Sequence, residues 1–195
     1  MNEEKKIRVM LLGDSIRMFT EEKTREKLGE AYEVWSPKDN CKFAANTFNL
    51  LHRYLKAFPS PDIIHWNNGL WDLAIYYDDG VMTPLPVYID YLSRIIRQLK
   101  KTGATIIFAT STPTRIEKET AYHLASRHFN ADIDRYNAAA VELMRSEGII
   151  VNDLNAAVRK DINRYIRDDD LIHPNEEGIN LISTLVSEKI KEIAL

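Results

Sequence analysis

The chain has 195 residues, which is enough for one sizeable hydrophobic core and hardly enough for two. Hydrophobic residues make up 45% and charged residues 28%, an ordinary globular composition that excludes an intrinsically disordered chain. The 26 basic and 29 acidic residues are interspersed and give a net charge of -3, so the chain has no basic stripe for nucleic acid. We therefore expect a single domain over residues 1–195 and no nucleic-acid partner.

The N-terminal segment, residues 1–6, is charged and leads directly into an apolar run. It leaves no room for the apolar core of a signal peptide, and no later run is long enough to span a bilayer. We expect no membrane span and a cytoplasmic location for the chain as given, although a secreted chain trimmed of its signal peptide would look the same. The only cysteine, Cys41, excludes an internal disulfide and a cysteine-based metal cluster, and we expect it to be a buried free thiol.

Short apolar segments alternate with amphipathic ones along the whole chain. Five of the apolar segments have the length and branched character of buried strands: residues 7–12, 32–35, 62–67, 104–109 and 149–151. Helical patterns cover residues 20–29, 87–101, 154–166 and 175–193, and a long region after Thr114. A further helical segment has Thr47, Leu51, Tyr54, Leu55 and Phe58 on one face.

Strands that alternate with helices predict a parallel sheet with helices on both faces and right-handed crossovers. We predict a three-layer α/β/α sandwich of the flavodoxin-like type, with about five parallel strands in the order 2-1-3-4-5. This order places a topological switch beside the first strand, and ligands bind beyond the carboxyl ends of the strands at such a point. The loop at residues 76–86, rich in turn residues, is expected near the same edge, where it could line a substrate site.

The first strand ends in Gly13-Asp14-Ser15, a glycine, an acid and a hydroxyl. A serine just beyond the end of a buried strand lies where such sheets usually carry their chemistry. The same tripeptide is also an ordinary turn, because glycine accepts positive φ while aspartate and serine cap helices. This stretch alone therefore leaves a nucleophile and a plain turn as alternatives.

A second polar stretch, Asp168-Asp169-Asp170, precedes His173 near the last predicted helix. A serine hydroxyl needs a base to take its proton, and a histidine base needs an acid to hold its tautomer. Asp170 and His173 are three residues apart, so one short turn can present both side chains to the same cleft. A solvated acidic turn, or a cap for the helix that follows, is the alternative to this catalytic interpretation.

Together these stretches resemble the SGNH hydrolases, also called GDSL-type esterases and lipases. The segment at residues 13–16 resembles the nucleophile block, and residues 170–175, with the letters DLIHPN, resemble the Asp-x-x-His block. The resemblance implies that Ser15 is the nucleophile, that His173 is the general base and acid, and that Asp170 orients His173. Asp168 and Asp169 lack the three-residue spacing.

The middle of the chain departs from the common pattern of that family. Where the family has a glycine whose N–H binds the oxyanion, this chain has Asn40-Cys41-Lys42, and the main-chain N–H of Cys41 or Lys42 could serve instead. Trp71 stands where the common Gly-x-Asn-Asp block has its asparagine. A subset of the family resembles Asn-x-Gly-Leu-x-Asp-Leu, which residues 67–73 match.

That match implies the donors of the oxyanion hole. It gives Asn67 as the side-chain donor, with Asn68 as second choice, beside the N–H groups of Ser15 and Lys42. We further expect Asp14, Asn68 and Trp71 to contact the substrate.

The implied chemistry is two-step acyl transfer from an ester to Ser15 and then to water, with no cofactor and no metal. The predicted function is a serine esterase acting on small acyl esters, with acetyl favoured, on a small-molecule or carbohydrate partner. An O-acyltransferase would use the same site. The sequence leaves the acyl group, the alcohol and the oligomeric state open.

Two alternatives come from other classes of protein. A non-catalytic flavodoxin-like binding module is disfavoured, because only Asp14 is available for a receiver site and no phosphate-binding glycine motif is present. A metal hydrolase using Asp168, Asp170 and His173 is disfavoured because the other histidines lack ligand spacing. Those histidines are His52, His65, His123 and His128.

Overall fold

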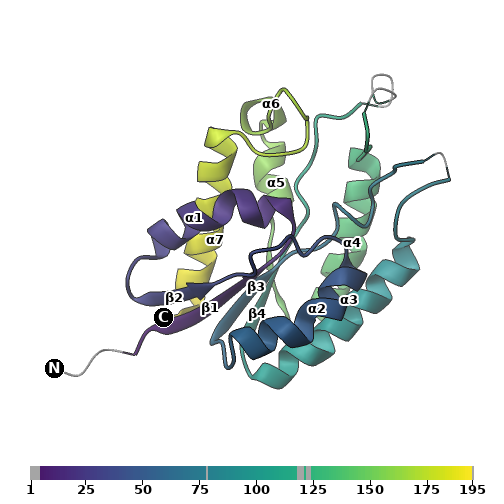
Figure 1. Ribbon diagram of the computed structural model, residues 1–195. Helices are drawn as coiled ribbons and strands as arrows, with labels where there is room; N and C mark the ends of the chain where they lie inside the picture. Colours follow the sequence, from purple (N-terminus) through teal and green to yellow (C-terminus); the bar gives the residue numbers. More distant parts are fainter. Residues whose placement is uncertain (1–4, 78, 118–120, 122–123, 195) are drawn as a thin grey trace.

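The computed structural model describes residues 5–77, 79–117, 121 and 124–194. Its centre is a five-stranded parallel sheet in the order β2-β1-β3-β4-β5, which confirms the predicted order (Figure 1). The strands are β1 (Ile7–Leu12), β2 (Tyr32–Trp35), β3 (Ile63–Trp66), β4 (Thr105–Ala109) and β5 (Ile150–Asn152). In the register of β1, Val9 pairs with Val34 of β2 and with Ile63 of β3. All four β3 residues are buried, because helices cover both faces of the sheet.

Helices form a layer on each side of this sheet (Figure 1). One layer contains α1 (Ser15–Leu28), α5 (Leu154–Arg159), α6 (Ile162–Tyr165) and α7 (Glu176–Ala194). The other contains α2 (Ala44–Ala57), α3 (Leu85–Leu99) and α4 (Asn130–Ser146), and a short 3₁₀ turn, η1 (Lys100–Thr102), follows α3. The three-layer α/β/α prediction is confirmed. None of the helices in the described ranges is both long and apolar enough to cross a membrane.

Aromatic residues of the core connect the sheet to the loops at its carboxyl edge. The Trp66 and Phe108 rings meet edge to face, 5.0 Å between centroids, inside the layer formed with α3 and α4. Beside them Tyr88 and Tyr136 lie 5.2 Å apart. The Tyr88 hydroxyl donates to the Asn68 carbonyl (2.8 Å), and the core therefore fixes the backbone just after β3.

Helix α1 begins at Ser15, earlier than the predicted start near Thr20. The Asp14 carboxylate accepts a hydrogen bond from the Ile16 N–H (2.9 Å), a cap that starts the helix at the serine. Apolar periodicity does not reveal such a start, since it depends on one capping side chain.

Two other helix predictions differ from the structure. Residues 111–117 and 124–129 contain no α-helix, because Asn130 exchanges two hydrogen bonds with the backbone of Thr114 and the Thr114 hydroxyl donates to the His128 carbonyl. His123 lies outside the described residues. The helix predicted at residues 154–166 divides into α5 and α6, where Asp161 accepts from the Arg164 N–H and caps the second piece.

Candidate active site

Ser15 is the first residue of α1 and follows the end of β1 directly. A Cβ atom at Gly13 would lie 1.9 Å from Asn67 Oδ1 and 2.9 Å from Arg17 Cβ, so only glycine fits this turn. The first N–H groups of an α-helix have no partner within the helix, and the helix dipole favours negative charge there. The local fold therefore presents the Ser15 hydroxyl at a position suited to stabilising an anion.

The structure brings Ser15, His173 and Asp170 into one hydrogen-bonded series. His173 Nε2 lies 2.8 Å from Ser15 Oγ, and His173 Nδ1 lies 2.8 Å from Asp170 Oδ2. The second oxygen, Asp170 Oδ1, accepts from the N–H groups of Ile172 and His173, at 2.9 Å each. Partial burial acts to raise the pKa of Asp170. The two N–H donors and the His173 ring outweigh this effect, so the pKa of Asp170 lies below its usual value. Asp170 is thus held as a carboxylate facing the imidazole.

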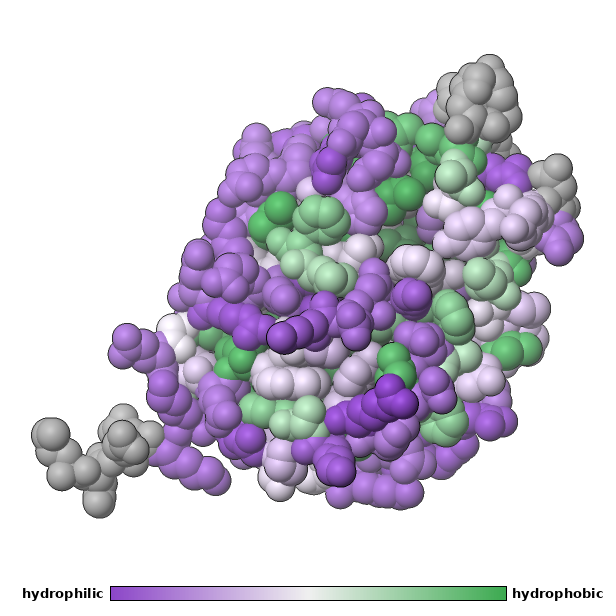
Figure 2. Space-filling model, in the orientation of Figure 1, coloured by the Kyte–Doolittle hydropathy of each residue, from purple (hydrophilic) through white to green (hydrophobic). Residues whose placement is uncertain are grey.

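The turn that carries His173 is itself fixed. The His173 carbonyl accepts from the Arg167 N–H (2.9 Å), and the Phe19 ring packs 4.9 Å from the imidazole. Figure 2 shows hydrophobic surface over the N-terminal half of α1, where Phe19 is 40% exposed, within a mostly hydrophilic face. The imidazole therefore has an apolar neighbour on one side and a carboxylate on the other.

The other two acidic residues of this stretch face arginines. Asp168 pairs with Arg115, and Asp169 pairs with Arg167. Arg167 lowers the pKa of Asp169, so this group too is a carboxylate. Of the three neighbouring aspartates, only Asp170 contacts His173 in the structure.

Cys41 and Lys42 lie directly beside the nucleophile turn. The Cys41 N–H donates to the Gly13 carbonyl (3.1 Å), and the Gly13 N–H lies 3.4 Å from Cys41 Sγ. Cys41 is buried and free, as predicted. Lys42 has a φ of 55°, in the left-handed region that glycine adopts at no cost. Its N–H donates to Asn40 Oδ1 at 2.7 Å.

The two asparagines after β3 lie behind the nucleophile turn. Asn67 is 7% exposed and packs against Gly13, next to the fully buried Asp14. Burial raises the pKa of Asp14 above its usual value, and hydrogen bonds from the Asn67 amide and the Ile16 N–H only partly offset this rise. The predicted contacts of Asp14, Asn67 and Asn68 with substrate or oxyanion stay predictions.

Asn68 is fully buried, and both its amide nitrogen and its amide oxygen hydrogen-bond within the protein. Its Nδ2 donates to the Lys42 carbonyl (2.8 Å) and to Thr47 Oγ1 (2.9 Å), and its Oδ1 accepts from Trp66 Nε1 (2.6 Å). Asn68 therefore joins the end of β3 to the loop that carries Lys42.

A cavity of about 260 Å³ lies at Ser15, a size suited to a small acyl group. Ser15 at the start of α1 lines it together with residues of the loops at the carboxyl edge of the sheet: Leu70, Trp71, Tyr76, Ser126, His128, Ile172 and His173. Trp71, a predicted substrate contact, lines this cavity. Tyr76, which also lines it, belongs to the loop expected near this edge. Burial lowers the pKa of His128 to about 4, so its ring is neutral. Sequence reasoning missed His128 and Ser126, which belong to no recognisable motif, and it gave no role to Leu70 and Ile172, which lie inside the blocks at residues 67–73 and 170–175.

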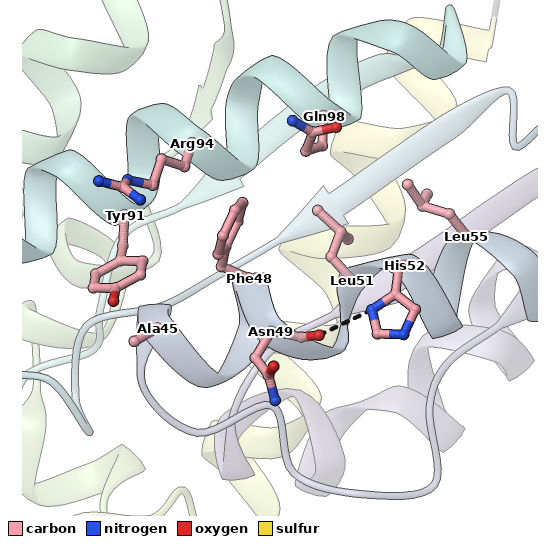
Figure 3. Close-up of a pocket in the computed structure, with 9 residues that line it drawn as sticks. All are labelled: Ala45, Phe48, Asn49, Leu51, His52, Leu55, Tyr91, Arg94 and Gln98. Atoms are coloured by element: carbon pink, nitrogen blue, oxygen red, sulfur yellow. Dashed lines mark hydrogen bonds between the residues drawn. The ribbon is translucent and has the colours of Figure 1, made fainter.

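A larger cavity, about 710 Å³, lies between α2 and α3 and contains none of the catalytic candidates. Figure 3 shows Phe48, Leu51 and Leu55 of α2 facing Tyr91 and Gln98 of α3 across it. Its side chains offer no nucleophile with a base. Among the described residues, no group of three His, Cys, Asp or Glu side chains could hold a metal ion.

Asp72 is a buried carboxyl next to the site and gives a pH-dependent prediction. It accepts from the Ala44 N–H at the start of α2 (3.0 and 3.1 Å), and burial raises its pKa to about 7. Between its unfolded pKa near 3.8 and about 7, the folded state holds the proton more tightly, so its contribution to stability falls as pH rises.

We expect the stability of Asp72→Asn relative to the unsubstituted protein to increase by on the order of 4 kcal/mol between pH 4 and pH 8. The measurement is urea unfolding of both proteins across this range. The neutral His65 and His128 act in the opposite direction, but they are present in both proteins and cancel in the difference. A difference that stays constant with pH would contradict the prediction.

Comparison with known proteins gives one family match. Residues 19–180 match the GDSL-like lipase/acylhydrolase family, a stretch that contains Asp170 and His173 and begins just after Ser15. No curated protein matches the chain.

Several solved structures share the fold. An acetyl xylan esterase, AlAXEase, superposes with a TM-score of 0.72 at 17% identity, over 94% of this chain and 100% of that one. The lipase/acylhydrolase from Enterococcus faecalis gives 0.75 at 17% identity, over 95% of each chain. A carbohydrate esterase family 3 protein from Talaromyces cellulolyticus gives 0.66 at 16% identity, over 96% of this chain and 97% of that one.

Proposed function

Because the chain belongs to the GDSL-like lipase/acylhydrolase family, whose members are carboxylic ester hydrolases, we propose that it is a serine esterase acting on small acyl esters. The observation that carries the proposal is the series Asp170–His173–Ser15, with both side-chain contacts at 2.8 Å. The small cavity at Ser15 supports an acetyl group as the acyl part. The likeness to an acetyl xylan esterase and a carbohydrate esterase supports a carbohydrate as the alcohol part.

The proposed reaction proceeds in two steps. Neutral His173 takes the Ser15 proton as Oγ attacks the ester carbonyl, and the imidazolium is stabilised by Asp170. The imidazolium then protonates the leaving alcohol, which leaves an acyl group on Ser15. Water, deprotonated by the same imidazole, attacks this acyl-enzyme; the imidazolium returns the proton to Ser15 Oγ, and the acid leaves.

We propose three donors for the oxyanion that forms in each step. The Ser15 N–H at the start of α1 is the first. The Lys42 N–H is the second, with the substrate oxygen replacing Asn40 Oδ1 as its acceptor. The Asn67 amide, the side-chain donor that the resemblance implies, is the third, and its carboxamide packs against Gly13, two residues before the nucleophile.

A fluorophosphonate probe followed by peptide mass spectrometry tests the proposal directly. We expect a covalent adduct on Ser15 and turnover of p-nitrophenyl acetate, with acetate released to water. Adding an acetylated xylo-oligosaccharide tests the carbohydrate alcohol, and adding a free sugar acceptor reveals any acyl transfer. Absence of both the adduct and turnover would contradict the esterase proposal.

The third donor gives its own prediction. We expect Asn67→Ala to lower kcat by roughly 100- to 1,000-fold with little change in KM, because a donor aimed at developing charge acts mainly in the transition state. The matched control is Asn68→Ala, one residue away. It should largely keep kcat per folded molecule but lose about 2–4 kcal/mol of stability, since it leaves the Lys42 carbonyl, Thr47 and Trp66 without their partner.

Steady-state kinetics and thermal unfolding of both variants separate these outcomes. Near-normal kcat in both variants would assign the oxyanion hole to backbone N–H groups alone, and loss of kcat in Asn68→Ala only would make Asn68 the donor.

A further inference from the structure

Lys42 occupies a backbone conformation that a lysine adopts only at a cost. Its φ of 55° lies in the left-handed region, which is disfavoured by roughly 1 kcal/mol for a residue with a Cβ. Strained positions of this kind persist when the surrounding structure fixes them, and they gather at functional sites. Here the Lys42 carbonyl is held by the buried Asn68 amide at 2.8 Å. The fold therefore fixes the backbone from which the Lys42 side chain starts.

The Lys42 side chain reaches a residue that lines the catalytic cavity. Its Nζ lies 5.8 Å from the centre of the Trp71 ring, within the range of a cation–π contact. Trp71 lines the cavity at Ser15, while the N–H of the neighbouring Cys41 is bonded to the Gly13 carbonyl. Lys42 thus lies between the nucleophile turn, which its neighbour Cys41 contacts, and Trp71 in the cavity wall.

Among the described residues, no acidic side chain pairs with the Lys42 ammonium. Each of the three aspartates near His173 has a positive or imidazole partner: Asp168 with Arg115, Asp169 with Arg167, and Asp170 with His173 and Arg167. In the described part of the chain, no ion pair involves Lys42. An exposed ammonium next to an aromatic ring is a suitable contact for an anionic group on a ligand.

From this geometry we propose that Lys42 and Trp71 form a subsite for the alcohol part of the substrate and select esters whose alcohol carries a carboxylate. The proposal rests on the proposed function, because the acyl group is placed at Ser15. The carboxylate of the alcohol pairs with Lys42 Nζ at the edge of the cavity, and Trp71 covers the ring that bears it. An acylated uronic acid has this chemistry, as does an acylated hydroxybenzoate.

The test compares two acetyl esters that differ in one charge. 4-Acetoxybenzoate is the anionic ester, and methyl 4-acetoxybenzoate is the neutral one. We expect the ratio of their kcat/KM values to fall by about threefold to fivefold in Lys42→Gln, the effect of one exposed charge pair, and to be kept in Lys42→Arg. The ratio for the unsubstituted protein should also fall as salt is raised from 20 to 300 mM, because salt screens exposed charges. Lys38→Gln, in the same loop, is the matched control and should leave the ratio unchanged.

A binding measurement makes the result independent of turnover. On the Ser15→Ala background, NMR titration with 4-acetoxybenzoate should show about threefold to fivefold weaker binding when Lys42→Gln is added. If Lys42→Gln leaves both the kcat/KM ratio of the two esters and the affinity for 4-acetoxybenzoate unchanged, the proposed subsite is wrong. If the unsubstituted protein hydrolyses neither ester, the proposed esterase function fails, and the titration still decides whether Lys42 binds a carboxylate.

Discussion

Ser15→Ala is expected to abolish ester hydrolysis while leaving the fold intact. The Ser15 hydroxyl lies at the start of α1 and contacts His173 Nε2, whereas the cap of this helix is formed by Asp14 and not by the serine. Removing the hydroxyl therefore removes the nucleophile and leaves the helix start unchanged. Loss of a serine nucleophile lowers kcat by on the order of 10⁶-fold in a comparable triad.

The measurement is initial-rate hydrolysis of p-nitrophenyl acetate, together with circular dichroism and thermal unfolding. Ser126→Ala is the matched control, because Ser126 lines the same cavity but has no such contact with His173. It should keep most of the activity. Substantial turnover by Ser15→Ala would remove the nucleophile from the mechanism.

His173→Ala is expected to have an effect of the same order, on the order of 10⁶-fold in kcat, because no other base contacts Ser15 Oγ in the described part of the chain. Asp170→Ala should lose less, on the order of 10⁴-fold, since it only orients the ring and stabilises the imidazolium. The double variant Ser15→Ala/His173→Ala should be no worse than either single one, because the two residues act as a unit.

Asp169→Ala is the control for the carboxylate, since Asp169 is adjacent in the chain but pairs with Arg167. Rates of the four variants with p-nitrophenyl acetate check the order. A greater loss in Asp169→Ala than in Asp170→Ala would show that the wrong aspartate was chosen.

Most of the fold could be predicted from the sequence, because the apolar strands and their alternation with helices are strong local signals. The β1 and β2 bounds agree with the prediction, and so does the strand order. The boundary of α1 and the irregular segment before α4 could not be predicted in this way. Both depend on single side chains that hydrogen-bond to the backbone, Asp14 in the first case and Asn130 in the second.

The candidate site likewise contains residues that the sequence predicts and residues that it does not. Ser15, Asp170 and His173 could be predicted from spacing and resemblance, and the structure brings them together. His128 could not, because it comes from a segment without periodicity and reaches the cavity only through tertiary packing. The positive φ of Lys42 is likewise invisible in the sequence, where a lysine gives no signal for a left-handed conformation.

The packing of α1 against α7 has a consequence for how this protein could diversify. Helix α1 begins with the nucleophile, and α7 begins just after the turn that carries His173, so the two reacting groups belong to one helix layer. Leu70, Trp71, Tyr76 and His128, which border the cavity, belong instead to segments after β3 and before α4. The residues of proton transfer and these residues of the cavity wall are thus encoded in separable parts of the chain. Insertions or exchanges in the second set can change the accepted ester while the proton-transfer machinery keeps its geometry, which makes these segments the first choice for directed evolution of new substrates.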